Sequence, residues 1–333
     1  MPMKKIKTYF LVLGILCLTF PFNLATSWSN GSYSYDNVNY DYDTDYGTHD
    51  WIAEGALDAL MAFDPNNWGW LNDMNRKKIY LVGTEAPDNS GVSMTLDGDL
   101  VEGRGDTRNH HVYILGIKTN VTEDDSAIRA RECGDAAIAA IGANKLNKAA
   151  FYLGALTHYL ADLAMYAHVA PNNHWPDYID FDEHHSTVES RVLTRTNAFD
   201  NREEFFRYLS VTVGNMKPYD AAIDLAWETY QDPTPSESPE RDAVWLHNNF
   251  FSDWASNYAD RASGSSTEQK YYTRIEDSLN NAIEYCASAM NYLGGVESLT
   301  MPSYPLPVIG LVLGISMIGI ILFEMKKNHF NFN

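Results

Sequence analysis

The most constraining feature of this chain is the apolar stretch of residues 149–170, which carries His158 and Asp162 in its middle. The stretch is apolar enough to form a buried helix, and side chains four residues apart lie on one face of a helix. Burying an unpaired imidazole or carboxylate costs on the order of several kcal/mol, whereas binding a divalent cation turns this cost into binding free energy. The stretch therefore predicts a buried helix that carries metal ligands.

More ligand-type side chains lie further along the chain. His168 comes six residues after Asp162, and His185 and Glu189 repeat the spacing of four. A second pair at this spacing can again bind one ion from one helical face. By the same geometry, His158 and Asp162 can bind the same ion or adjacent ones.

The first 27 residues have the pattern of a secretory signal peptide. Lys4, Lys5 and Lys7 form a basic start, residues 10–20 are apolar, and small residues occupy positions 25–27. This pattern predicts export and cleavage after Ser27.

A second apolar segment lies near the C-terminus, at residues 301–324. Residues 301–323 contain no charge, and Lys326 and Lys327 follow. About 20 apolar residues are needed to cross a bilayer, and basic residues mark the cytoplasmic side. The pattern predicts an extracellular domain at residues 28–300, a transmembrane helix and a short cytoplasmic tail at residues 325–333. A buried C-terminal core helix is the alternative.

The body of the chain is predicted to be all-α. Strand-type alternation is scarce, and Gly and Pro fall mainly between the helical patterns. These patterns occupy residues 50–63, 76–82, 126–141, 148–169, 202–213, 221–230, 241–259 and 270–292.

The charge balance bears on possible partners. The chain has 24 basic and 44 acidic residues, a formal charge of −20. Binding to a nucleic-acid backbone depends on clustered Lys and Arg, so we expect no long nucleic-acid footprint. Two cysteines of the mature chain, Cys133 and Cys286, can form one disulfide in an oxidising compartment, although their spacing does not establish it.

Four segments together resemble a known family. They are Gly47-Thr48-His49, the run Gly-Thr-Glu-Ala-Pro-Asp at residues 83–88, Asn-His-His-Val-Tyr at residues 109–113, and residues 150–189 with His158, Asp162, His168, His185 and Glu189. Their order and spacing resemble the bacterial zinc-dependent phospholipase C family, which includes clostridial alpha-toxin and is related to the P1-type nucleases. The resemblance covers residues 28–191 and implies a multi-helix bundle of the phospholipase C/P1 nuclease type.

The resemblance also implies three zinc ions. Asp88, His158, Asp162 and either His111 or His110 would bind the first, and His168, His185 and Glu189 the second, with His174 as a rival ligand. His49, Asp162 and the mature N-terminus at Trp28 would bind the third.

The same resemblance implies a reaction. Zinc favours phosphodiester hydrolysis, because it polarises phosphoryl oxygens and activates water, and Asp88 or Glu189 could orient or deprotonate that water. The first expectation is a membrane-anchored surface phospholipase C that cleaves phospholipid headgroups. The alternatives are an extracellular P1-like nuclease and a surface protein whose zinc is purely structural.

Overall fold

The computed structural model describes residues 46–106, 109–169, 188–189, 192–193, 196, 208–231 and 266–298. The chain divides into two compact units, Met1–Gly294 and Gly295–Asn333, and the elements below belong to the first, apart from the last turn of α10. The predicted signal peptide, the apolar segment at residues 301–324 and the helix at residues 241–259 lie outside the described residues. None of the described helices is long and apolar enough to span a bilayer.

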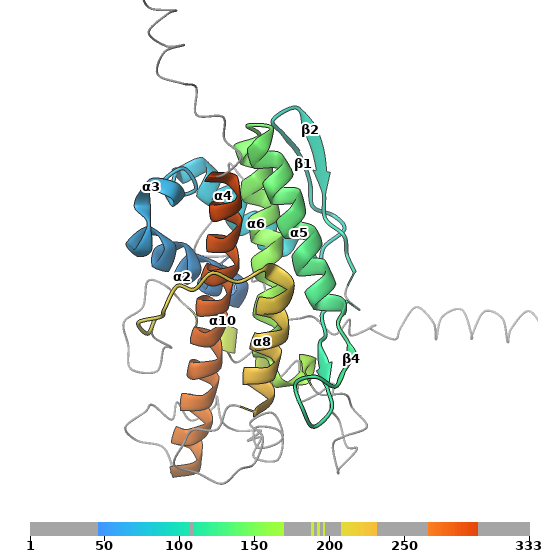
Figure 1. Ribbon diagram of the computed structural model, residues 1–333, viewed down its shortest axis with the longest axis vertical. Helices are drawn as coiled ribbons and strands as arrows, with labels where there is room; N and C mark the ends of the chain where they lie inside the picture. The colour runs from blue at the N-terminus through green and yellow to red at the C-terminus, as the bar shows by residue number, and fades with distance from the viewer. Residues whose placement is uncertain are drawn as a thin grey trace, which may run out of the picture. The chain divides into compact units, whose positions relative to one another are not determined.

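The described residues are mainly helical, which confirms that part of the prediction (Figure 1). The α-helices are α2 (Thr48–Phe63), α3 (Pro65–Trp68), α4 (Met74–Glu85), α5 (Asp125–Gly142), α6 (Leu146–Ala161), α8 (Pro218–Gln231) and α10 (Ser266–Ser298). Side-chain caps stabilise the N-terminal ends of some of these helices. The Asp73 carboxylate accepts from the N–H groups of Asn75 and Arg76 at the start of α4, and Asp50 accepts from the Gly47 N–H at the start of α2.

Two small antiparallel hairpins were not predicted from the sequence. Strand β1 (Ser93–Leu96) pairs with β2 (Asp99–Glu102), and β3 (Tyr113–Ile114) pairs with β4 (Val121–Glu123). Asp97 and Gly98 connect the first pair with φ of 51° and 84°. Asp-Gly is a favoured two-residue hairpin turn because both positions need a positive φ.

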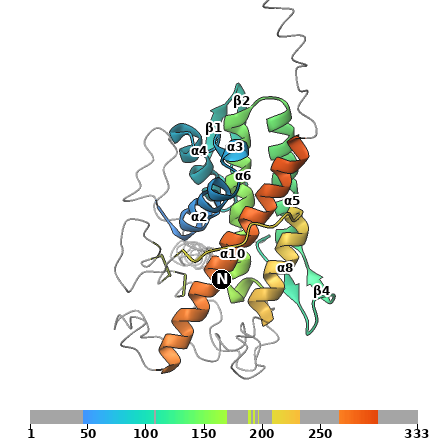
Figure 2. The same ribbon diagram turned by 60° about the vertical axis from the view of Figure 1, so that its left-hand side comes forward.

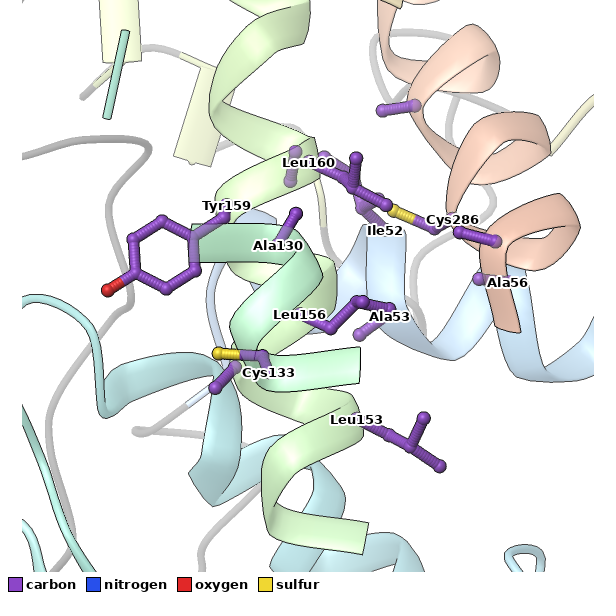
Figure 3. Packing of buried hydrophobic residues seen from close by; sticks show 14 of the residues in the cluster. Ile52, Ala53, Ala56, Ala130, Cys133, Leu153, Leu156, Tyr159, Leu160 and Cys286 are labelled. Carbon is purple, nitrogen blue, oxygen red and sulfur yellow. The ribbon is translucent and has the colours of Figure 1, made fainter. Parts of the chain in front are cut away.

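Helix α6 lies at the centre of the fold, packed against α4 and α5 (Figures 1 and 2). Apolar side chains surround it: Leu153, Leu156 and Leu160 of α6 belong to one buried cluster with Ala130 of α5 and Ile52 of α2 (Figure 3). This all-round burial matches the apolar sequence of the helix. It also leaves any polar side chain on α6 in need of a partner.

The two buried cysteines are free thiols, so the disulfide left open by the sequence does not form. Cys133 lies on α5 and Cys286 on α10, at well-separated points of the core (Figure 3). The Cys286 thiol donates instead to the Thr157 carbonyl at 3.7 Å. Burial raises the pKa of Cys133 to about 12, which makes its thiol unreactive.

Two glycines let α4 and α6 pack with their backbones in contact. A Cβ at Gly154 would lie 2.0 Å from the Tyr80 carbonyl oxygen, and a Cβ at Gly83 would lie 2.3 Å from the Phe151 carbonyl oxygen. Only glycine permits so close an approach. The crossing brings the C-terminal end of α4 next to the last turns of α6.

The prediction of a helix at residues 202–213 is wrong for residues 208–213, which have no regular secondary structure. The segment crosses α10 in Figures 1 and 2, and side chains of α10 bind its backbone. The Leu209 N–H donates to Asn280 at 2.7 Å, and the Gly214 N–H donates to Ser288 at 2.8 Å. These bonds satisfy backbone groups that a helix would have paired internally.

Candidate metal centre

Several elements bring their polar side chains together at the C-terminal end of α6. His158 lies in the last turn of α6, and Asp162 begins the 3₁₀ helix η1 (Asp162–Ala164). His49 lies in the first turn of α2, while Asp88 and His110 lie in the loops after α4 and β2. The predicted helix over residues 148–169 therefore ends at Ala161, and the chain continues through η1 and η2 (Tyr166–His168).

One donor group consists of His49, His158 and Asp162, all completely or almost completely buried. The Nε2 atom of His49 lies 3.0 Å from Oδ1 of Asp162. The two imidazoles stack with ring centroids 4.0 Å apart. Three ligand-type atoms within 4.8 Å of one another match the span of a cation site.

A second donor group consists of Asp88, His110 and His158. The Nε2 atom of His158 lies 3.2 Å from Nδ1 of His110 and 3.8 Å from Oδ1 of Asp88. Oδ1 of Asp88 and Nε2 of His110 are buried and have no hydrogen-bond partner among the described residues. Buried polar atoms are nearly always satisfied, so Oδ1 of Asp88 points to a missing ligand, and Nε2 of His110 lacks a hydrogen-bond partner in the described part of the chain.

Asp162 connects the two groups. Its Oδ1 faces His49, while its Oδ2 lies 2.5 Å from Nδ1 of His110 and 3.3 Å from Nε2 of His158. A carboxylate with each oxygen directed at a different set of nitrogens has the geometry of a bridging ligand. The role of Asp162 as a ligand shared by two ions stays a prediction from the family resemblance.

A backbone contact sets the orientation of His158. Its Nδ1 lies 2.6 Å from the Thr84 carbonyl oxygen, which can only accept, so Nδ1 carries the proton. The lone pair of the neutral ring is then on Nε2, the atom that faces Asp88, His110 and Asp162. Metal-binding histidines are typically oriented in this way. The glycine crossing of α4 and α6 brings Thr84 close enough to do so.

The electrostatic environment favours positive charge between the carboxylates. Burial alone would lower the pKa of His110, but the carboxylates of Asp162, Asp106 and Asp88 outweigh it and raise this pKa to about 10. Burial and the neighbouring His158 instead lower the pKa of His49 to about 4. Although burial acts in the opposite direction, His158 and His110 hold the pKa of Asp162 well below its usual range. A cation placed here would be stabilised by the same field.

A third set of ligand-type side chains lies nearby in the sequence. Nε2 of His168 lies 3.7 Å from Oε1 of Glu189, and both side chains are almost completely buried. His111 does not join Asp88 and His158; its ring stacks on His168 with centroids 5.0 Å apart. Of the two adjacent histidines, the structure brings His110 into the Asp88–His158 group, because the two side chains leave the loop in different directions.

Three residues named from the sequence lie outside the described residues: Trp28, His174 and His185. Their roles as ligands stay predictions. The sequence reading also missed Asp106, which lies 3.7 Å from Nε2 of His110. Asp106 and His110 are four residues apart but do not lie in a helix, so this spacing did not indicate their contact.

The fold and the site together define a mainly helical protein with a buried cluster of imidazoles and carboxylates suited to cations. No family model matches the chain, and no curated protein does. Among solved structures, alpha toxin from Clostridium absonum is 15% identical with a TM-score of 0.47, over 75% of this chain and 63% of that one. Alpha-toxin from the avian Clostridium perfringens strain SWCP is 17% identical with a TM-score of 0.43, over 79% and 64%. The chain thus covers less than two thirds of each toxin's length, and likenesses at these scores fix neither family nor activity.

Proposed function

We propose that this protein is a zinc-dependent phosphodiester hydrolase. The observation that carries the proposal is the position of Asp162 between two donor groups that share His158. Cations bound on both sides of one carboxylate would lie close together. Paired cations are the arrangement that stabilises both the attacking and the leaving oxygen of a phosphoryl displacement.

The residues present fit zinc. Imidazole nitrogens with carboxylate oxygens are common zinc ligands, and the unsatisfied Oδ1 of Asp88 supplies a ligand atom that needs a partner. Asp88, His110, His158 and Asp162 would bind one ion, and His49 with the other oxygen of Asp162 would contribute to a second. Bound zinc would polarise phosphoryl oxygens and make water a better nucleophile at neutral pH.

The chain's own side chains have separable tasks in this proposal. Asp88 is partly exposed, with 13% of its side chain accessible, whereas His158 and Asp162 are fully buried. Asp88 is therefore the carboxylate best able to reach both a ligand position and a water molecule, which suits a general base. Glu189, beside His168, is the alternative base. The Thr84 carbonyl holds the His158 ring in place throughout the reaction.

Phospholipid is the proposed substrate, cleaved on the glycerol side of the phosphate. The family resemblance of the sequence supports this choice, and the net charge of −20 disfavours a polyanionic nucleic acid. Export through residues 1–27 and anchoring through residues 301–324 belong to the same proposal, since they would present the site at the cell surface.

The test uses the purified full chain, loaded with zinc after chelation. Release of phosphorylated headgroup from phospholipid micelles is compared with cleavage of single-stranded DNA and of a small aryl phosphodiester. Asp162→Asn should bind less zinc and lose activity, while Asp99→Asn, which alters an aspartate bound to Lys145 and Lys148, should behave as wild type. Faster cleavage of DNA than of lipid would make the protein a nuclease. Bound zinc without turnover of any diester would make the metal structural.

A further inference from the structure

The loop that carries His110 is joined to the turn that carries Asp88 by backbone hydrogen bonds. The Arg104 N–H donates to the Ala86 carbonyl at 2.7 Å, and the Asp106 N–H donates to the Pro87 carbonyl at 2.9 Å. Gly103 permits this contact, because a Cβ there would lie 2.0 Å from the Asn89 carbonyl oxygen. Asp106 is thereby fixed beside the turn that presents Asp88.

Side chains from two helices and the loop itself hold the Asp106 carboxylate. The Tyr159 hydroxyl of α6 donates to Oδ1 at 2.7 Å, and Nε of Arg129 on α5 contacts Oδ2 at 2.8 Å. The Asn109 amide adds a third contact at 3.3 Å. Although burial acts in the opposite direction, His110 and the hydrogen bonds from Tyr159 and Asn109 hold the pKa of Asp106 well below its usual range. A charged acceptor is therefore oriented next to His110.

The two nitrogens of His110 face different neighbours. Nδ1 faces Asp162 and the lone-pair nitrogen of His158, whereas Nε2 lies 3.4 Å from Asp88 and 3.7 Å from Asp106. A neutral imidazole has one lone pair and one N–H. If Nδ1 is the ligand atom, Nε2 must carry the hydrogen and needs an acceptor. Asp88 belongs to the donor group itself, so Asp106 is the carboxylate left for this purpose.

We propose that Asp106 is a positioning residue that binds the Nε2–H of His110 and so directs the Nδ1 lone pair of His110 toward the cation. The inference rests on the proposed function, since it requires a metal at this site. The Nε2–Oδ1 separation of 3.7 Å is longer than a hydrogen bond, and a small rotation of the His110 ring on metal binding would close it. Carboxylates behind metal-binding histidines commonly have this role.

The experiment measures zinc affinity of the chelated full chain by competition with a chromophoric chelator. Asp106→Asn keeps the size of the side chain and removes its charge, and Asp99→Asn is the matched control. We expect Asp106→Asn to weaken the tightest ion by about 10- to 100-fold while the number of ions at saturation stays that of wild type. Asp99→Asn should leave affinity and stoichiometry unchanged.

A second variant tests whether the effect on zinc affinity comes from the positioning of Asp106. Tyr159→Phe removes one donor to Asp106 but no polar atom of His110, so it should weaken zinc binding in the same direction and by less. Wild-type affinity in Asp106→Asn would overturn the inference, as would a zinc deficit at saturation, which would make Asp106 a ligand. Wild-type protein that binds no zinc would instead reject the proposed function, so the two failures are distinguishable.

Discussion

Gly154→Ala tests whether the contact of α4 with α6 determines both stability and the site. The new Cβ would lie 2.0 Å from the Tyr80 carbonyl oxygen, so the two helices must separate by on the order of 1 Å to reach a tolerable contact. Such overpacking against backbone costs up to about 3 kcal/mol, and the better helix propensity of alanine returns about 1 kcal/mol. The expected net loss in free energy of unfolding is about 2 kcal/mol.

A loss of this size should lower the melting temperature of the chelated protein by about 4–8 °C in calorimetry. The separation should also lengthen the 2.6 Å contact between His158 Nδ1 and the Thr84 carbonyl, and zinc affinity should fall with it. Gly295→Ala is the matched control: its Cβ meets nothing within 4 Å, and it lies in α10, so stability should rise by up to about 1 kcal/mol. The reasoning fails if Gly154→Ala is as stable as Gly295→Ala.

Three further outcomes are expected. Ser126→Ala should lower the free energy of unfolding by about 1–2 kcal/mol in urea titrations, because it removes a buried hydrogen bond of 2.6 Å to the Tyr159 carbonyl; an unchanged midpoint would contradict this. Cys133 and Cys286 should react with iodoacetamide only after unfolding, as peptide mapping would detect, and labelling of folded protein would refute their burial. In chelated protein, the His49 pKa of about 4 lies below its ordinary value, so its contribution to stability is present above about pH 6.5 and is lost as the pH falls toward 4. His49→Gln should flatten that part of the stability curve, and a variant with the wild-type pH dependence would exclude His49 as the cause.

The helical body was predictable because its apolar periodicity is strong. Residues 126–141 and 221–230 were predicted within a few positions of α5 and α8, since each buries one continuous face. The grouping of His158 with Asp162 followed from their spacing of four. The end of α6 at Ala161 could not be predicted in this way. The apolar pattern continues through residues 163–169, although the backbone there has changed to 3₁₀ turns.

Other parts of the site depend on contacts that no local pattern encodes. The distinction between His110 and His111 is set by the path of their loop, which hydrogen bonds to residues 86–92 determine. The Thr84 carbonyl that orients His158 is a backbone group, which every residue has, so the residue type at position 84 does not indicate this role. Asp106 was missed for a related reason: its partners Tyr159 and Arg129 come from two separate helices.

The non-helical segment at residues 208–217 is recognised through its main chain. Asn280, Glu284 and Ser288 stand four residues apart on α10 and accept from the N–H groups of residues 209, 212 and 214. The side chains of those three residues make none of these bonds. Evolutionary change should therefore be restricted at these three positions of α10 and more freely accepted at the exposed Leu209 and Thr212, each of which contributes a backbone N–H.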